Sequence, residues 1–498
     1  MRDAIVETRY GKVRGTNQGA VSVWKGIPFA QPPVGALRFR APQPLVAWSH
    51  VRDATAFGTI APQAIIEGNG FFGARRLTQE PESEDCLYLN IWSPVSRADG
   101  KKRPVMVWLH GGAFTMGSGS TATYDGTNFA MHGDVVVVTL NYRLGALGFL
   151  HLGELAGEQY ATSGNNGLLD QIAALQWVRD NIEAFGGDSN AITIFGESAG
   201  AMSVGTLLAM PAAKGLFHQA ILQSGAAHSV RGKDTASAIT HEFLQALDIR
   251  GNEMTSLLQM PVDDLLAAQA VVLRKHASIT FGPVVDGVSL PLAPSAAISS
   301  GIANDVAVLI GTNRDEMRLF RVGAAATAPD EKALQRTFGV AAGKAITTYT
   351  SARPGLPLSE VWTAVLTDQV FRIPAIRLAE KQAQHGAPVW MYRFDWATPA
   401  FGGIFGASHA LEIPFVWNNL DTPGLGMLLQ DFPGRQQLAN RMHKAWIAFA
   451  RDGNPNTPDL PPWPRYDAVH RSTMLFDEVC RVVDDPQAEE RRLWEGLL

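Results

Sequence analysis

Short apolar runs bounded by glycine and polar turns divide the middle of the chain. Residues 105–109, 135–140, 191–195 and 306–310 each have the length of a strand, and the second run is mostly β-branched. Such runs are typical of strands that are covered on both faces. The first part of the chain holds shorter candidates separated by turns, of which residues 21–29 are an example.

A helical pattern follows the second run. Between residues 168 and 185 apolar side chains recur near helical spacing, with Leu169, Ile172 and Leu175 among them. We predict a helix that ends by Gly186, because glycine readily adopts the backbone conformation that closes a helix. Strands that alternate with helices in this way favour a mainly parallel sheet with right-handed crossovers.

Length and composition favour one large unit. The chain has 498 residues, 46% of them hydrophobic, and neither a low-complexity linker nor an internal repeat divides it. We expect a single α/β catalytic domain over residues 1–498, with insertions and a candidate regulatory or cap subregion at about 320–405. The net charge of −5 comes without a basic stripe, so nucleic acid is not an expected partner.

No segment predicts export or membrane insertion. The first residues lack the apolar core of a signal peptide, and residues 135–150 are too short and contain Asn141 and Arg143. Two cysteines, Cys86 and Cys480, cannot build a disulfide framework. We therefore expect a cytoplasmic protein without a membrane partner, as a monomer or weak homo-oligomer.

A serine lies in a Gly-x-Ser-x-Gly pattern directly after the third run. The segment Gly196-Glu197-Ser198-Ala199-Gly200 follows residues 191–195 and precedes an apolar stretch that we expect to be helical through Met210-Pro211. A serine between strand and helix takes a strained backbone geometry, and its flanking glycines avoid collisions. The pattern alone also fits an idle surface turn, but this context predicts that Ser198 is a nucleophile.

Attack by a serine on a carbonyl places negative charge on the oxygen, which needs preorganised N–H donors. One donor is expected to be the amide of Ala199, and others to come from His110-Gly111-Gly112-Ala113-Phe114, the loop after residues 105–109. We expect His110 to shape this loop. The serine also needs a histidine base and a carboxylate, which follow it in the order acid, then histidine. Spacing alone leaves several histidines open as the base: His218, His228, His241, His276, His385, His409 and His443.

These motifs resemble the type B carboxylesterase family, which includes bacterial para-nitrobenzyl esterases and the cholinesterases, over nearly the whole chain. The resemblance is carried by GIPFA at 26–30, SEDCLYLN at 83–90, VWLHGGAF at 107–114, NYRLG at 141–145, GNNGLLD at 164–170, FGGD at 185–188, GESAG at 196–200, LQSG at 222–225 and GNPN at 453–456. It implies an α/β-hydrolase fold, in which helical insertions on a large, mostly parallel sheet form a gorge over the active site.

The resemblance also implies roles for single residues. The acid falls on Glu316 and the base on His409, while Gly112, Ala113 and Ala199 become the oxyanion donors. Asp315 competes with Glu316 for the acid, and a solvated acidic turn would explain either. Glu197 resembles the family's acid beside the nucleophile and Ser224 its buried polar partner near the histidine, although both also fit purely structural roles.

The chain departs from the family pattern at two places. The cysteine that pairs with Cys86 in eukaryotic relatives is replaced by Ala61, so we expect a free Cys86 and a mobile loop over residues 61–82. Where cholinesterases narrow the acyl pocket with aromatic side chains, this chain has Ala277, Ser278 and Ile279. We predict a wider acyl pocket at these three residues, and we expect Phe114 to contact the substrate as well.

The resulting prediction is a serine carboxylesterase that forms an acyl-enzyme on small to medium, apolar or aromatic esters. It needs no organic cofactor, and no Cys/His spacing predicts a metal site. Hydrolysis of carbamates or amides, or acyl transfer to an alcohol, remains an alternative on the same residues. A non-catalytic binding protein is a further alternative, against which the intact Ser198 argues.

Overall fold

One sheet of 13 strands organises the computed structural model, which describes residues 3–64, 80–95, 100–249, 254–276, 279–321 and 328–497. The strand order is β1-β2-β3-β5-β7-β6-β8-β9-β12-β13-β14-β15, with β4 paired to β2. Along this order, consecutive strands from β7 to β14 are parallel to one another. Antiparallel pairs link β1 through β7 at one end and β14 to β15 at the other. A separate parallel pair joins β10 to β11. The strands are β1 Asp3–Thr8, β2 Gly11–Gln18, β3 Val21–Pro28, β4 Arg52–Asp53, β5 Tyr88–Pro94, β6 Arg103–Leu109, β7 Val136–Leu140, β8 Gly187–Glu197, β9 Gln219–Gln223, β10 Arg231–Gly232, β11 Val284–Val285, β12 Ala307–Asn313, β13 Val389–Phe394, β14 Ser472–Phe476 and β15 Arg481–Asp484.

The central strands are apolar on both faces because each face carries its own layer of helices. In β6, Val105 and Val107 belong to one hydrophobic cluster, whereas Met106 and Trp108 belong to the other. This follows from the alternation of side chains along a strand. The continuous apolar pattern that predicted doubly covered strands is therefore confirmed.

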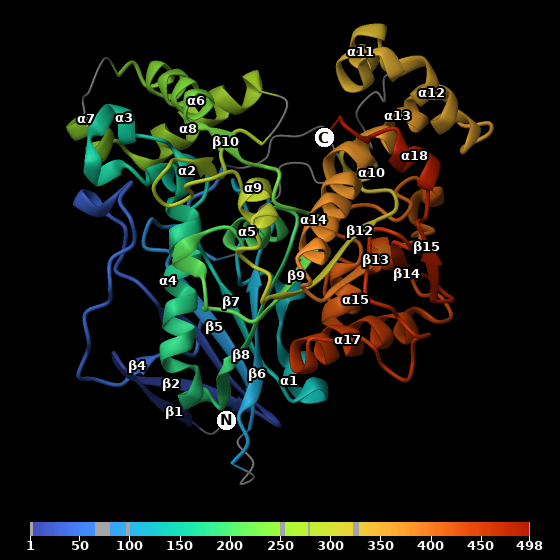
Figure 1. Ribbon diagram of the computed structural model, residues 1–498. Helices are drawn as coiled ribbons and strands as arrows, with labels where there is room; N and C mark the ends of the chain where they lie inside the picture. Colours follow the sequence, from blue (N-terminus) through green and yellow to red (C-terminus); the bar gives the residue numbers. More distant parts are fainter. Residues whose placement is uncertain are drawn as a thin grey trace.

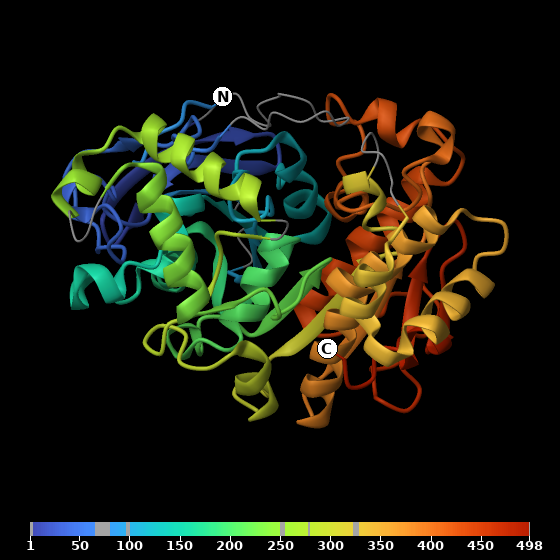
Figure 2. The same ribbon diagram turned by 90° about the horizontal axis from the view of Figure 1, so that it is seen from above.

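Helices α4, α5 and α14 contribute to the first cluster, and α1, α15 and α17 to the second. Figure 1 shows α1, α15 and α17 gathered beside the sheet, apart from the long α4. Figure 2 shows the N-terminal strands (blue) and the C-terminal strands (red) at opposite ends of the sheet. The helices are α1 Thr127–Gly133, α2 Gly145–Phe149, α3 Gly153–Ala156, α4 Asn166–Asn181, α5 Ala199–Leu207, α6 Lys233–Ala246, α7 Met254–Gln259, α8 Val262–Lys275, α9 Pro294–Ser299, α10 Arg318–Arg321, α11 Glu331–Phe338, α12 Ala342–Ser351, α13 Leu358–Thr367, α14 Ile373–Gln384, α15 Ile413–Trp417, α16 Gly426–Leu429, α17 Arg435–Asp452 and α18 Ala488–Arg492.

The predicted helix over residues 168–185 corresponds to α4 and the 3₁₀ turn Ile182–Phe185 that continues it. It ends as expected at Gly186, whose φ of +83° is left-handed. The helix after the serine is shorter than predicted, because α5 ends at Leu207. Pro211 explains the difference: a residue that precedes proline is disfavoured in helical conformation, so the chain leaves the helix before Met210.

The α/β fold class is confirmed. Cys86 is a buried, free thiol, and Ala61, which replaces the pairing cysteine of eukaryotic relatives, is buried as well. The predicted subregion at 320–405 includes β13, a strand of the central sheet, and its regulatory or cap role stays a prediction. Most of the 61–82 loop, residues 65–79, lies outside the described residues. Within the ranges given above, no helix combines the length and apolar character needed to cross a bilayer.

Candidate active site

Ser198 forms the sharp turn between β8 and α5. Its φ is +55° and its ψ −123°, a strained conformation for a residue with a side chain. The turn is held from both sides, since the Ser198 N–H donates to the Gln223 carbonyl over 2.9 Å and the Ser198 carbonyl accepts from Met202 N–H over 2.8 Å. A Cβ on Gly196 would lie 2.6 Å from the carbonyl carbon of Gly200. Only glycine therefore fits at that flank of the serine.

The glycine loop after β6 lies against this turn. A Cβ on Gly111 would be 3.2 Å from the Cβ of Ser198. Gly112, Ala113 and Phe114 follow with φ of +109°, +53° and +61°. In the described part of the chain, no hydrogen bond to another residue uses the N–H of Gly112 or Ala113. These N–H groups remain available beside the serine.

His409 and Glu316 are joined although 93 residues separate them. His409 Nδ1 lies 2.7 Å from Glu316 Oε2, and the His409 N–H donates to the Glu316 carbonyl over 3.3 Å. Glu316 Oε1 accepts from Asn313 N–H over 2.7 Å. His409 Nε2 lies 3.0 Å from Oε1 of Glu197, the residue before Ser198. The imidazole thus lies beside the serine turn, with one nitrogen held by Glu316.

Asp315, the competing acid, points elsewhere. Its Oδ2 accepts from Ala407 N–H over 2.9 Å, and its own N–H donates to the Ala407 carbonyl over 2.9 Å. Arg314 pairs with the same carboxylate at 3.0 Å. Asp315 therefore ties the loop before His409 to the end of β12, while the next residue, Glu316, contacts the imidazole.

Comparison with known proteins agrees with this geometry. The family model described as "Carboxylesterase family" matches residues 2–494. A para-nitrobenzyl esterase of Bacillus subtilis is 43% identical over 99% of this chain and 98% of its own length. The chain belongs to the carboxylesterase family. A solved carboxylesterase of Geobacillus stearothermophilus superposes with a TM-score of 0.89 at 47% identity, over 98% of this chain and 99% of that one. Human cocaine esterase is 35% identical over 93% of this chain and 85% of its own length.

The resemblance to type B carboxylesterases and the α/β-hydrolase fold are thereby confirmed. Among the residues that the structure describes, no group of three or more His, Cys, Asp or Glu side chains could hold a metal ion. The groups gathered in this carboxylesterase are a serine, an imidazole, carboxylates and backbone N–H donors.

Three buried carboxylates surround the imidazole of this carboxylesterase. Glu197 is 4% exposed, and Glu316 and Glu412 are fully buried. Burial raises the pKa of Glu197, and the charge of Glu412 raises it further. Burial by itself lowers the pKa of His409, but the carboxylates of Glu197 and Glu316 outweigh it and raise this pKa above its ordinary value. Glu197 and His409 therefore both favour their protonated forms more than they would in water.

Glu412 belongs to a second layer of buried polar contacts. Its Oε2 accepts from Asn313 Nδ2 over 2.6 Å and its Oε1 from Gln223 Nε2 over 3.0 Å. The same Asn313 Nδ2 donates to the Ser408 carbonyl over 2.7 Å. Asn313 and Gln223 end β12 and β9, so the two strands hold the loop of His409 through Glu412. Sequence reasoning did not assign Glu412 a role, although it follows His409 by three residues.

The rings of two phenylalanines lie against the imidazole of His409, the candidate base. The ring of Phe371 is 4.8 Å from that of His409 and is buried, whereas Phe320 is 5.1 Å away and 53% exposed. Sequence reasoning assigned neither ring. Phe320 follows Glu316 by only four residues, and this short separation was a usable signal. Phe371 lies in the π-helical turn Asp368–Arg372, and no local pattern connects that turn to His409.

His110 and Ser224 are both buried, and their roles stay predictions. Burial lowers the pKa of His110 to about 4, and its ring stacks on Tyr142 at 4.4 Å. His110 Nδ1 lies 2.8 Å from the Gly111 carbonyl, a contact that shapes the glycine loop. Ser224 is fully buried with a φ of +54°, and within the described residues its hydroxyl has no hydrogen-bond partner.

The residues expected to bind the substrate are only partly described. Phe114 is fully buried and packs on Phe149, with ring centroids 5.1 Å apart. Ile279 is half-buried, and its carbonyl accepts a hydrogen bond from Arg231. Residues 277 and 278, Ala277 and Ser278, lie outside the described part of the chain. The width of the acyl pocket therefore stays a prediction.

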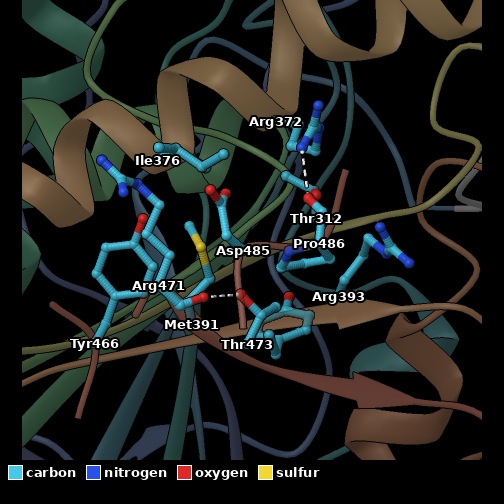
Figure 3. Close-up of a pocket in the computed structure, with 12 residues that line it drawn as sticks. Thr312, Arg372, Ile376, Met391, Arg393, Tyr466, Arg471, Thr473, Asp485 and Pro486 are labelled. Atoms are coloured by element: carbon cyan, nitrogen blue, oxygen red, sulfur yellow. Dashed lines mark hydrogen bonds between the residues drawn. The ribbon is translucent and has the colours of Figure 1, made fainter. Parts of the chain in front are cut away.

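A cavity beside β12, β13 and α14 is distinct from these residues (Figure 3). Its arginines are ion-paired: Arg372 lies 2.6 Å from Asp368, and Arg471 lies 2.9 Å from Glu380. The cavity is lined by Thr312, Arg372, Ala375, Ile376, Met391, Tyr392, Arg393, Tyr466, Arg471, Thr473, Asp485 and Pro486. Neither the serine nor His409 is among them, so we assign it no role in ester binding.

Proposed function

We propose that this carboxylesterase hydrolyses esters through an acyl-enzyme, with Ser198 as nucleophile, His409 as base and Glu316 as the acid that orients it. The 2.7 Å contact between His409 Nδ1 and Glu316 Oε2, beside the strained turn of Ser198, carries the proposal. A carboxylate on Nδ1 fixes the tautomer that leaves Nε2 free to accept a proton.

The reaction proceeds in two halves. Ser198 Oγ attacks the ester carbonyl carbon while His409 Nε2 takes the hydroxyl proton. The resulting oxyanion is stabilised by the N–H groups of Gly112, Ala113 and Ala199. The alkoxide leaves with the proton from His409, and a water molecule then attacks the acyl-enzyme by the same path. Both the nucleophile and the base are side chains, so no metal or organic cofactor enters a step.

His409 must change partner during this cycle. Its Nε2 lies 3.0 Å from Glu197 Oε1, and in the described chain Ser198 Oγ makes no hydrogen bond to the imidazole. Catalytic hydrogen bonds often tighten only when substrate is bound. We infer that substrate entry turns Nε2 from Glu197 toward Ser198, and that Glu197 stabilises the imidazolium formed after proton transfer.

Apolar and aromatic esters of small to medium size are the proposed substrates. The half-exposed ring of Phe320 lies beside the imidazole and supports this choice, because it offers an aromatic face next to the reacting carbonyl. The cytoplasmic location and the monomeric or weakly oligomeric state expected from the sequence stay predictions.

Hydrolysis of para-nitrophenyl esters of increasing acyl length by wild type and Ser198→Ala tests the proposal. We expect turnover by wild type and a loss of at least about 10⁴-fold in the variant. A trapped acyl group on the peptide that contains Ser198, detected by mass spectrometry, would identify the nucleophile directly. Equal activity of the two proteins would refute it.

Matched ester, amide and carbamate substrates address the rival activities. A relative from Pseudarthrobacter oxydans, 37% identical over 97% of both chains, is named phenmedipham hydrolase, and phenmedipham is therefore included among the substrates. Added alcohol acceptors separate acyl transfer from hydrolysis. Faster turnover of carbamate or amide, or dominant transfer, would replace ester hydrolysis as the main activity while keeping the same nucleophile.

A further inference from the structure

Gln63 binds both backbone groups of Gly117, which lies just after the glycine loop His110–Phe114. Its Oε1 accepts from Gly117 N–H over 2.8 Å, and its Nε2 donates to the Gly117 carbonyl over 3.2 Å. The same Nε2 donates to the Ala61 carbonyl over 3.0 Å, which fixes the orientation of the amide. A single side chain therefore pairs with Gly117 as a neighbouring strand would.

Gly117 packs directly on the residues that precede the oxyanion donors. Its φ is +103°, and a Cβ there would lie 2.6 Å from the Gly111 carbonyl oxygen and 2.7 Å from His110 Nδ1. Met116, the residue before it, donates its N–H to the Gly112 carbonyl over 3.1 Å. A displacement of Gly117 is therefore transmitted to the backbone of both Gly111 and Gly112.

The loop needs such external support because its backbone is strained. Gly112, Ala113, Phe114 and Gly117 all have positive φ. Non-glycine residues in this region persist only where the surroundings determine their conformation. Gln63 supplies part of this support from outside the loop.

Gln63 is itself firmly anchored. Its N–H donates to Glu82 Oε2 over 3.2 Å. Next to it, the Ile60 N–H donates to the Pro81 carbonyl over 3.0 Å, and the Ser83 N–H donates to the Ile60 carbonyl over 2.9 Å. These bonds connect the segment around Ile60 and Gln63 to the segment from Pro81 to Ser83. Together the two segments hold the Gln63 side-chain amide in place.

We propose that Gln63 is a positioning residue for the oxyanion hole. By holding Gly117 it fixes the N–H groups of Gly112 and Ala113 at the place where negative charge develops. The inference rests on the proposed acyl-enzyme mechanism, in which these two groups stabilise the oxyanion. Gln63 itself touches no reacting atom. Because it acts only through the N–H groups that stabilise the oxyanion, we expect it to affect the transition state and not the initial binding of the ester.

The experiment compares Gln63→Ala and Gln63→Asn with wild type. The amide of asparagine is one methylene short of Gly117. We expect kcat to fall about ten- to a hundredfold with KM changed less than threefold, since a small misplacement of catalytic groups has effects of this size. A trifluoromethyl ketone, which forms a tetrahedral adduct with the serine and presents an oxyanion, should bind more weakly by the same factor.

Gln43→Ala is the matched control. Gln43 is also half-buried and donates its Nε2 to the carbonyl two residues earlier, Ala41, over 3.0 Å, but it has no bond to Gly117. It should retain wild-type kcat and inhibitor affinity. If Gln63→Ala does not fold, Gln63→Glu provides the same readouts, because it keeps the acceptor for Gly117 N–H and loses the donor.

Two outcomes overturn the inference. One is a folded Gln63 variant with wild-type kcat. The other is a fall in kcat that leaves the affinity of the trifluoromethyl ketone unchanged, which would show a structural effect elsewhere. Failure of the proposed function is recognised separately: either the wild-type protein does not hydrolyse esters, or Ser198→Ala keeps the wild-type activity.

Discussion

The half-exposed ring of Phe320 lies 5.1 Å from the imidazole of His409, at an angle of 46°. It also stacks on the buried Phe371, with ring centroids 6.5 Å apart and planes within 9°. The two rings therefore form a continuous aromatic wall beside the base, one face of which is open to solvent. Phe320 is the member of this wall that an incoming ester can contact.

Replacement of Phe320 by alanine should change substrate preference more than stability. We expect kcat/KM for aromatic esters to fall about tenfold relative to acetyl esters, because an aromatic pair contributes about 0.5–1.5 kcal/mol. Thermal stability should stay within about 0.5 kcal/mol, as for other exposed positions. Val479→Ala, at a 70% exposed position in the turn between β14 and β15, is the control. An equal loss for all esters would contradict a role in selection.

Glu197→Gln should move the acid limb of the pH profile of kcat/KM to lower pH. The base must be neutral to accept a proton, so activity rises as pH increases through the pKa of His409. The carboxylate 3.0 Å away favours the imidazolium and raises this pKa, and removal of its charge lowers it. We expect a shift of about one pH unit or more. Glu183→Gln, a surface acid paired with Lys102, should leave the limb in place.

An unmoved acid limb in Glu197→Gln would mean that Glu197 is protonated in the free enzyme at the pH where His409 titrates. Titration of His409 by NMR in the same variant distinguishes this case from a change in the rate-limiting step. A limb that moves to higher pH would contradict the electrostatic argument itself.

Glu316→Gln and Asp315→Asn should differ sharply although the residues are adjacent. Glutamine at 316 no longer fixes the imidazole tautomer, and we expect kcat to fall about 10⁴-fold. Asparagine at 315 keeps an oxygen for the Ala407 N–H, so we expect less than about a tenfold change. Steady-state kinetics with a para-nitrophenyl ester measures both. Similar losses in the two variants would leave the identity of the acid open again.

Gly200→Ala should prevent stable folding, because a methyl group there would overlap the Leu109 carbonyl oxygen on β6. Backbone atoms cannot yield as a flexible side chain can, so we expect a destabilisation above about 3 kcal/mol. Gly343→Ala is the opposite case, since this exposed glycine of α12 has no heavy atom within 4 Å of an added Cβ. It should stabilise the protein by up to about 1 kcal/mol. Thermal unfolding and soluble yield test both variants.

The local elements could be read from the sequence because local physics decides them. The β-branched run that forms β7 is stable only where helices cover both faces of the sheet. Gly196 and Gly200 are required because added side chains would collide with backbone atoms around the Ser198 turn. The same holds for Gly186, which closes the 3₁₀ turn that continues α4. At Met210 the apolar pattern favoured a continued helix, whereas the following proline disfavoured it. The helix ends before Met210, so the proline had the larger effect.

The site beyond the serine could not be derived in this way. Several histidines had suitable spacing, and the structure distinguishes them by surroundings: His443 is buried against the Val416 carbonyl, which lies 2.8 Å from its Nδ1, whereas His409 meets Glu316. Only the family resemblance selected His409. Phe371 contacts His409 from 38 positions away along the chain, and Gln63 contacts Gly117 from 54 positions away. A periodic pattern of apolar residues does not indicate contacts between residues so far apart in sequence.

The parallel order β8-β9-β12-β13 has a consequence for how this enzyme can diversify. Ser198 and Glu316 are attached just beyond the ends of β8 and β12, and hydrogen bonds from Asp315 and Asn313 tie the His409 loop to that same edge. The intervening segments, such as α6 to α9, return to the sheet without setting the spacing of these groups. Insertions and deletions in those segments can therefore change the shape of the substrate pocket while the distances between the reacting groups stay the same. New substrate specificities can then arise from changes in these segments without a change in the catalytic residues.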